Sequence, residues 1–335
     1  MRYIIYGAGA IGGVVGGRLF AAGKDTVLIC RGRHLEAIRD GGLLLRDPTG
    51  DRTLRVPTAG SPAELHFTDQ DVVILTMKAQ DTSAALDALE AAGGRDVAVV
   101  CCQNGVANER MAARRFDRVY AMLVALPATF MEPGVVIGWS APVAGVLDIG
   151  RFPDGTDVLC DQVGADLGDA GFICRPDPAV MRLKYAKLLT NLGNGFDAIS
   201  TLSRAGEPFR RIMHALTQEA IACFNAAGIA YTPREEYNAH VSRHTSWGEI
   251  PGAERGGSST WQSLSKGSSR LEVDYLNGEI VLLGRLHGVP TPYNAAVRRL
   301  AQQLAAEGGK PGAYDADDVE ALAARLGATA NAPAD

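Results

Sequence analysis

Short runs of apolar residues alternate with amphipathic stretches through the first half of the chain. Residues 3–6, 71–77 and 97–102 are rich in β-branched side chains, which is typical of parallel strands buried on both faces. Helical apolar spacing follows the first run at Ile11, Val14, Val15, Leu19 and Phe20. This alternation predicts an α/β domain with a doubly wound sheet of the Rossmann type. Residues 134–137 and 143–149 are expected to form an antiparallel pair within it.

The pattern changes near Arg175-Pro-Asp-Pro178. Prolines interrupt regular structure and favour an extended link, and beyond them the apolar spacing is helical almost throughout. We therefore expect an N-terminal domain over residues 1–177 and an all-helical domain over residues 178–327. Residues 328–335 are small and polar, and we expect a disordered tail there.

Three glycines follow the first apolar run, at Gly7, Gly9 and Gly12. This G-x-G-x-x-G spacing between a strand and a helix is typical of dinucleotide sites. Gly7 permits a tight turn, Gly9 lets the backbone approach a pyrophosphate, and Gly12 lets the helix pack close to its strand. The alternative is a glycine-rich turn that serves helix packing alone. The phosphate-binding backbone is expected to comprise Gly7, Ala8, Gly9, Ala10, Ile11 and Gly12.

The end of the second predicted strand, residues 25–31, distinguishes NAD from NADP. An NAD site has Asp or Glu about 20 residues beyond the glycines to bind the ribose 2′-OH. Here Cys30 and Arg31 occupy that place, whereas Asp25 comes too early. Guanidinium groups bind a 2′-phosphate that a carboxylate would repel. We therefore predict NADP with Arg31 as a ligand; the alternative is that Arg31 and Arg33 are solvated loop charges.

Two polar residues follow later strands. Lys78 comes after residues 71–77, and Asn104 after residues 97–102. Ligands of open α/β sheets bind outside the carboxyl ends of the strands, so both side chains are expected beside the cofactor. The alternatives are a loop lysine and an Asn-Gly turn residue.

Two stretches in the second half have unusual composition. Asn and Gly weaken a helix interior by up to ~1 kcal/mol, so Gly193 and Gly195 favour a site that something approaches closely over an ordinary solvated face. Ser258 and Ser259 precede a predicted helix, which one of them can cap. Glu272 and Asp274 lie about 200° apart on a helix, so one is expected to point inward and the other to solvent. One helix stripe is expected to carry Lys184, Lys187, Asn191 and Asn194.

These motifs together resemble the ketopantoate reductase (2-dehydropantoate 2-reductase) family, from Met1 to about residue 300. The resemblance implies a two-domain NADP enzyme that reduces 2-dehydropantoate, a small anionic 2-oxo acid, to pantoate on the pathway to pantothenate. The matching segments are Gly7-Ala-Gly-Ala-Ile-Gly12, Lys78-Ala-Gln80, Gln103-Asn-Gly-Val106, Lys187 with Asn191, Ser258-Ser259, Glu272-Val-Asp-Tyr-Leu-Asn-Gly278 and His287-Gly-Val-Pro-Thr-Pro-Tyr-Asn294.

The resemblance also implies roles for individual residues. Hydride transfer to a ketone leaves an alkoxide that needs a proton, and Lys187 matches the proton donor. Lys184, one turn earlier, is the alternative donor. Glu272 matches the acidic residue at the junction of cofactor and substrate, and counts as both a catalytic and a cofactor contact. Lys78 and Asn104 match cofactor contacts, and the implied substrate ligands are Asn104, Asn191, Asn194 and Ser259.

Three departures from the family pattern leave the identity of the oxo acid open. Gly195 stands where the family has a second Asn, with Asn194 one residue early. Ala205-Gly206-Glu207 stands where Asn-Gly-Glu is frequent, and Ser263 replaces a frequent Asp. The alternative functions are reduction of another 2-oxo acid or of an imine, and a non-catalytic NADPH sensor.

Composition and charge exclude several classes of binding partner and indicate a cellular compartment. The chain of 335 residues has a formal net charge of −5 with mixed signs, which gives no basic face for nucleic acid or anionic lipid. No apolar run approaches the ~18 residues of a membrane span. We expect no signal peptide, because the first predicted strand lies at the first residues. The six cysteines lack C-x-x-C pairs. We therefore expect a cytoplasmic protein with buried thiols and without a membrane partner.

Two further features have weaker implications. His240 and His244 are spaced i, i+4, but no Glu follows His240 and no third ligand stands nearby, so we predict no metal site. The apolar helices of the second half allow a homodimer interface, although a buried core explains them equally well.

Overall fold

The structure, a computed structural model, describes residues 1–130, 132–254 and 256–330, apart from the side chains of 329 and 330. The chain forms two compact units, Met1–Lys184 with Thr232–Glu254 and Tyr185–Tyr231 with Arg255–Asp335. Residues 178–184 and 232–254 thus pack with the N-terminal unit, although the sequence places them in the helical half. Each segment has a contact to the N-terminal residues that explains this: Lys184 pairs with Glu109 over 2.7 Å, and His240 contacts Asp148 over 2.5 Å.

A seven-stranded sheet forms the centre of the first unit, in the order β11-β8-β7-β6-β1-β2-β5. Only the terminal strand β11 runs antiparallel to its neighbour β8. Counted along the chain, the parallel strands are ordered 3-2-1-4-5-6, which is the order of the Rossmann fold. The strands are β1 (Arg2–Tyr6), β2 (Thr26–Ile29), β5 (Thr58–Ala59), β6 (Asp71–Leu75), β7 (Ala98–Cys101), β8 (Val119–Met122) and β11 (Ile149–Arg151).

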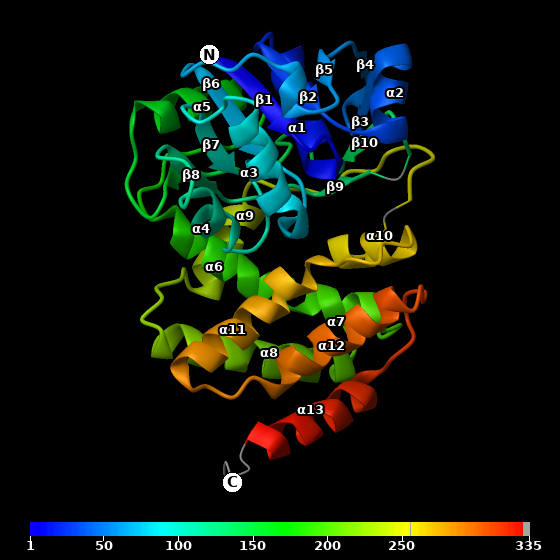
Figure 1. The fold of residues 1–335 in the computed structure, drawn as a ribbon. Coiled ribbons are helices and arrows are strands. Elements are labelled where there is room, and N and C mark those ends of the chain that lie inside the picture. Colours follow the sequence, from blue (N-terminus) through cyan, green and yellow to red (C-terminus); the bar gives the residue numbers. More distant parts are fainter. Residues whose placement is uncertain (131, 255, 331–335) are drawn as a thin grey trace. The chain divides into compact units, whose positions relative to one another are not determined.

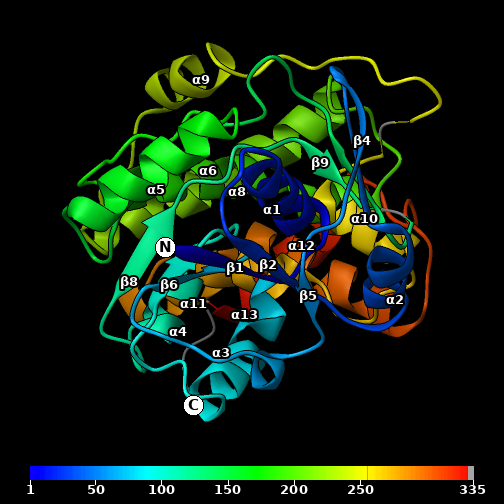
Figure 2. The same ribbon diagram turned by 90° about the horizontal axis from the view of Figure 1, so that it is seen from above.

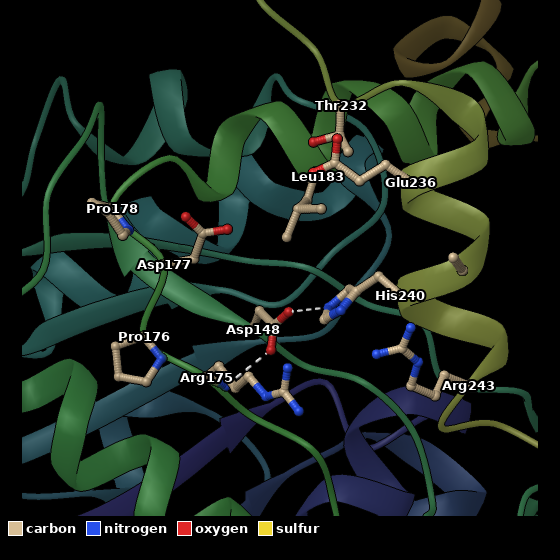
Figure 3. A pocket seen from close by; sticks show the side chains of 11 residues that line it. Asp148, Arg175, Pro176, Asp177, Pro178, Leu183, Thr232, Glu236, His240 and Arg243 are labelled. Carbon is tan, nitrogen blue, oxygen red and sulfur yellow. Dashed lines mark hydrogen bonds and ion pairs between the residues drawn. The ribbon is translucent and has the colours of Figure 1, made fainter.

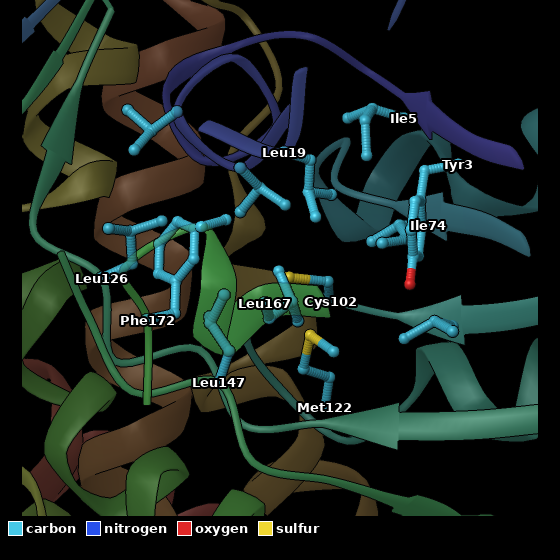
Figure 4. Close-up of a cluster of buried hydrophobic side chains, with 14 of the residues drawn as sticks. Tyr3, Ile5, Leu19, Ile74, Cys102, Met122, Leu126, Leu147, Leu167 and Phe172 are labelled. Carbon is cyan, nitrogen blue, oxygen red and sulfur yellow. The ribbon is translucent and has the colours of Figure 1, made fainter. Parts of the chain in front are cut away.

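Helices cover both faces of this sheet. Successive strand residues point to opposite sides, and the residues on both sides are apolar and need to be buried. Ile5 packs in a cluster with α1 (Ala10–Ala21) and α5 (Val158–Asp169), where Figure 4 shows Leu19 and Leu167. The adjacent Ile4 packs on the other face with α3 (Thr82–Ala91) and α4 (Asn108–Ala112). Figure 2 shows α1 and α3 on opposite sides of β1.

The cysteines follow the same alternation. Cys102 belongs to the cluster under α1, and Cys101 to the cluster under α3. Burial raises the pKa of the Cys102 thiol to about 12, and that of Cys101 also lies well above its usual range. All six cysteines are free, and Cys174 alone among them is only partly buried. At neutral pH these thiols are protonated and poorly reactive.

A second, four-stranded sheet has the order β4-β3-β10-β9. The expected antiparallel pair of residues 134–137 and 143–149 is wrong: β10 pairs with β3 in parallel and with β9, while Ile149 starts β11 on β8. The two segments pair with edges of two different sheets, at β3 and at β8. Each pairing provides hydrogen-bond partners for backbone N–H and C=O groups that an open strand edge would leave unpaired. The strands are β3 (Leu43–Asp47), β4 (Gly50–Leu54), β9 (Ala128–Thr129) and β10 (Val135–Gly138).

The remaining helices of the first unit are short. They are η1 (Pro62–Glu64), η2 (Ala79–Asp81), α2 (Gly32–Gly41) and α9 (Arg234–Ser242). Helix α6 (Val180–Asn191) begins in this unit, and its residues from Tyr185 onward belong to the second.

Helices are the only regular elements among the described residues of the second unit, which confirms the expected helical C-terminal domain (Figure 1). Helix α13 continues to Ala330, so the first three residues of the expected tail are helical, while 331–335 lie outside the described residues. No helix in the described part of the chain is long and apolar enough to cross a bilayer. The elements are α7 (Gly193–Ile199), α8 (Glu207–Ala226), α10 (Ser259–Ser265), η3 (Glu272–Tyr275), α11 (Asn277–His287), α12 (Pro292–Ala306) and α13 (Ala316–Ala330).

Candidate functional site

Four neighbouring strands of the large sheet end in register. Tyr6 is paired with Ile29 of β2 and Leu75 of β6, and Leu75 is paired with Cys101 of β7. The residues that follow these strands therefore leave the sheet at one edge. The sequence-predicted cofactor residues of the first unit all follow these four strands.

The glycine turn after β1 is shaped by close backbone contacts. Gly7 has a φ of +104°, and a Cβ there would lie 2.8 Å from the Met77 backbone nitrogen. A Cβ at Gly12 would lie 2.3 Å from the Thr76 hydroxyl oxygen, so no larger residue fits at either position. A Cβ at Gly9 would meet no described atom within 4 Å. The first and third glycines thus serve the turn and the packing, and the second leaves open space beside the backbone.

Helix α1 begins directly at this open space. Its N-cap, Gly9, supplies no side-chain cap, and the first turn carries no acidic residue. The first N–H groups of an α-helix lack acceptors within the helix, and the helix dipole favours an anion there. The described turn therefore fits a pyrophosphate.

The buried histidine of α2 holds the glycine turn in place, which nothing in the sequence spacing indicates. His34 Nδ1 accepts a hydrogen bond of 2.9 Å from the Gly134 N–H. Nε2 therefore carries the proton and donates it to the Ala8 carbonyl oxygen, 2.7 Å away. The ring also packs on Phe130, with 4.5 Å between ring centroids. His34 thus orients the backbone between the first two glycines.

Replacing His34 with alanine is expected to weaken the binding of a dinucleotide and to lower the free energy of unfolding by about 1–3 kcal/mol, because the Ala8 carbonyl and the Gly134 N–H lose their buried partner. Urea unfolding and a fluorescence titration with NADPH measure the two effects. His66→Ala is the control, since His66 is exposed. Equal NADPH affinity in His34→Ala and the wild type would contradict a positioning role.

Arg31 stands at the N-cap of α2 and is exposed, as is Arg33. Neither side chain makes a hydrogen bond or ion pair that the structure shows with the described residues. Their guanidinium groups thus keep their donors available. This arrangement fits a 2′-phosphate ligand, and it fits the alternative of a solvated loop charge as well.

Lys78 and Asn104 lie where the sequence predicts, beyond β6 and β7. Lys78 is the half-buried N-cap residue of η2. The Asn104 backbone carbonyl accepts from the Asn108 side chain over 3.1 Å. The side-chain oxygen of Asn104 is buried without a hydrogen-bond partner among the described residues. Because buried acceptors are rarely left unpaired, this atom fits a contact to a ligand N–H or O–H group.

Lys184 is buried, and its ammonium group binds backbone carbonyls at the ends of β7 and β8. Its Nζ lies 2.7 Å from the Glu109 carboxylate. It also donates to the carbonyls of Gln103 at 2.8 Å, Met122 at 3.1 Å and Cys101 at 3.3 Å. Lys184 is 3% exposed and Glu109 0%. The three ammonium hydrogens are therefore engaged by acceptors within the first unit.

The expected single stripe of four polar residues is wrong. Lys184 points to the strand ends, and α6 ends at Asn191 before α7 begins at Gly193, so Asn194 belongs to a different helix. A buried amide accompanies the interruption, since Asn277 donates to the Leu192 carbonyl over 3.0 Å. The role of Asn277 in this interruption was not predicted from the sequence.

The glycines of this stretch have a packing explanation. A Cβ at Gly193 would lie 2.3 Å from the Met213 sulfur of α8, and one at Gly195 would lie 2.9 Å from the Val297 side chain of α12. Close helix packing, rather than the approach of a ligand, therefore accounts for both glycines.

The two serines before α10 have different roles. The Ser258 hydroxyl accepts from the Trp261 N–H over 3.2 Å and donates to the Asn194 carbonyl over 3.1 Å. Ser258 is therefore the helix cap. The Ser259 hydroxyl is buried and has no hydrogen-bond partner within the described part of the chain. It remains available to a ligand, as the substrate-binding hypothesis requires.

A buried carboxylate fixes the start of α10. Asp197 accepts from the Ser258 N–H over 2.9 Å and pairs with Arg204 over 2.7 Å. Burial alone would raise the pKa of Asp197, but these contacts hold it below its usual value. The ionised carboxylate keeps Ser258, and with it the neighbouring Ser259, in position.

The other predicted residues of the second unit differ in exposure. Lys187 is half-buried on α6, and Asn191 is 5% exposed. Glu272 is buried at the start of η3, whereas Asp274 is 43% exposed and pairs with Arg298. The expected division into one inward and one outward carboxylate is confirmed.

The histidines at i, i+4 spacing are engaged with protein groups. His240 Nε2 lies 2.5 Å from Asp148, and the ring centroids of His240 and His244 are 6.1 Å apart. The described residues contain no group of three His, Cys, Asp or Glu side chains placed to hold a metal ion.

Comparison with known proteins gives matches along most of the chain. The family model described as "Ketopantoate reductase PanE/ApbA" matches residues 3–153, and its C-terminal counterpart matches residues 179–305. A relative from Pyrococcus horikoshii, 2-dehydropantoate 2-reductase, is 28% identical over 92% of this chain and 99% of its own.

Solved structures agree in fold. A PanE/ApbA family ketopantoate reductase from Ralstonia eutropha JMP134 is 28% identical, with a TM-score of 0.77 over 92% of this chain and 99% of its own. D-mandelate dehydrogenase with NADH and anilino(oxo)acetate has a TM-score of 0.79 over the same shares at 22% identity, a likeness of fold alone.

Proposed function

From the premise that the chain belongs to the ketopantoate reductase family, and is therefore an oxidoreductase, we propose that it reduces 2-dehydropantoate to pantoate with NADPH. The observation that carries this proposal is the match of both family models, one to each half of the chain. The open glycine turn and the available Ser259 hydroxyl support it, because the reaction needs a dinucleotide site and donors to an anionic acid.

The cofactor, when bound, supplies the hydride that reaches the 2-oxo carbon. In our proposal Lys187 donates the proton that the resulting alkoxide needs. The engagement of all three Lys184 ammonium hydrogens supports Lys187 over Lys184 as the donor. Glu272, which is buried at the start of η3, is proposed as the carboxylate at the junction of cofactor and substrate.

We further propose that uncharged donors bind the substrate. Ser259 and the amides of Asn191 and Asn194 suit a carboxylate, since they donate hydrogen bonds without titrating. Asn104 contributes a buried oxygen without a partner among the described residues, which suits a hydroxyl or amide donor of the substrate or cofactor.

NADP rather than NAD is proposed from Arg31. Arg31→Ala is expected to lower kcat/KM for NADPH by about tenfold to a hundredfold, because a charge-assisted contact to the 2′-phosphate is lost, and to leave kcat/KM for NADH nearly unchanged. Steady-state kinetics with both cofactors measure this difference. Arg299→Ala, another exposed arginine, is the control. A wild type that uses NADH as well as NADPH would show the assignment to be wrong.

The substrate is tested by NADPH oxidation over a panel of branched 2-oxo acids. We expect the highest kcat/KM for 2-dehydropantoate. A preference for another 2-oxo acid by about tenfold would favour the second candidate function. That candidate is suggested by Ala205, which stands where the family frequently has Asn. It is suggested also by Ser263, which replaces a frequent Asp and donates to the Ser259 carbonyl. NADPH binding without turnover of any 2-oxo acid would favour the third alternative, a non-catalytic NADPH sensor.

A further inference from the structure

The first unit contains a cavity of 420 Å³ that the proposed reaction does not use. It lies between α9, the start of α6 and the segment 175–178, and all of its lining residues belong to the first unit. The volume is within the range of small-molecule sites. Its lining combines apolar side chains, such as Leu183, with charged groups of both signs (Figure 3).

A buried aspartate and a half-buried histidine form a pair in the cavity wall. Asp148 is 2% exposed, and it accepts from the Arg175 N–H over 2.9 Å and contacts His240 Nε2 at 2.5 Å. Both carboxylate oxygens are therefore engaged within the protein. The contact also fixes the orientation of the imidazole ring.

Cationic side chains gather on one side of this pair. The Arg243 guanidinium makes no hydrogen bond or ion pair that the structure shows with the described residues. The Arg175 guanidinium has a contact of 3.5 Å to His244. The pKa of His244 is lowered by burial and then by the charges of Arg175, His240 and Arg243. This part of the cavity is therefore electropositive, with guanidinium donors available.

Carboxylates occupy the other side. Figure 3 shows Asp177 and Glu236 in the upper half of the view, with Arg175 and Arg243 in the lower half. Asp177 accepts from the Ala179 N–H with one oxygen, over 2.7 Å. Glu236 is exposed, and its carboxylate makes no hydrogen bond or ion pair that the structure shows with the described residues. The cavity is thus electropositive at one end and electronegative at the other.

We propose that this cavity binds a small zwitterion. The carboxylate of the ligand lies against Arg175, His240 and Arg243, because guanidinium groups bind carboxylates bidentately. Its ammonium group lies against Asp177 and Glu236, and its carbon chain packs on the apolar lining. A ligand with a single charge would leave one end of the cavity without a counter-charge. The proposal is independent of the reductase activity.

Binding of the proteinogenic amino acids, γ-aminobutyrate and ε-aminocaproate to the full chain is the test, by thermal shift and then by titration calorimetry. Butyrate and butylamine provide the two halves of γ-aminobutyrate. We expect at least one zwitterion to bind, and to bind about tenfold or more tightly than a singly charged molecule of similar length.

Variants on α9 locate the binding. Arg243→Ala and Glu236→Gln are each expected to weaken the zwitterion about tenfold or more, since each removes one charged contact. Arg234→Ala and Glu235→Gln are the matched controls, because both residues are exposed on the same helix and do not line the cavity. Circular dichroism checks that the variants are folded.

Three outcomes would overturn the proposal. The first is no zwitterion binding up to about 10 mM. The second is unchanged affinity in both Arg243→Ala and Glu236→Gln, which would place the ligand elsewhere. The third is equal binding of butyrate and the best zwitterion, which would make the site one for carboxylates alone.

Discussion

Lys187→Ala is expected to lower kcat for the reduction of 2-dehydropantoate by about a thousandfold, because the alkoxide loses the proton donor that we propose for it. Stopped-flow and steady-state measurements of NADPH oxidation give this value. The affinity for NADPH, measured by fluorescence, should change little. Lys310→Ala is the matched control, since Lys310 is an exposed lysine between α12 and α13.

A second variant distinguishes the loss of a proton donor at residue 187 from the loss of a positive charge there. Lys187→Arg keeps a cation, but a guanidinium holds its proton too tightly to donate it. It should therefore be nearly as slow as Lys187→Ala, and added methylamine should restore part of the activity of the alanine variant. Full activity in Lys187→Ala would remove this residue from the mechanism and return Lys184 to consideration.

Lys184→Met is expected to lower the free energy of unfolding by about 3–5 kcal/mol. The substitution leaves the Glu109 carboxylate buried without its cation, and three backbone carbonyls without their donor. Urea unfolding followed by circular dichroism measures the loss. The double variant Lys184→Met, Glu109→Met should be more stable than the single variant, because it removes the uncompensated charge as well.

The control for this prediction is a lysine in a surface ion pair. Lys24 pairs with Asp166 and Asp169 near solvent, and Lys24→Met should change stability little because exposed pairs contribute little. A stable Lys184→Met protein would show that the Lys184–Glu109 pair is not an anchor. Loss of turnover without loss of stability in that variant would instead indicate a direct part in proton transfer.

The local pattern of the sequence predicts much of the first unit. Strands buried on both faces have continuous apolar runs, so the sequence predicts β1, β6 and β7. The glycine spacing follows from contacts between neighbouring segments, so the sequence also predicts the turn at Gly7. The sequence does not predict which strands residues 134–137 and 143–149 pair with. Their partners depend on which sheet edges are open, and apolar spacing carries no information about that.

For the candidate site, the sequence indicates which element a residue follows, but it does not indicate which groups surround the side chain. Asn104 and Ser259 follow the expected elements, and each has a buried polar atom without a partner in the described ranges. The contacts of Lys184 with Glu109 and of His34 with Ala8 join segments distant in the chain, so spacing could not reveal them. Gly195 was misinterpreted for the same reason, since Val297 approaches it from another helix.

The shielding of the native thiols has a practical consequence. Five of the six cysteines are buried, and burial raises the pKa of the sixth, Cys174, well above its usual range. A maleimide dye reacts with exposed thiolates, so a cysteine pair introduced on the surface could be labelled without first removing the native ones. One label on each unit would then report their separation in solution by energy transfer, with and without NADPH.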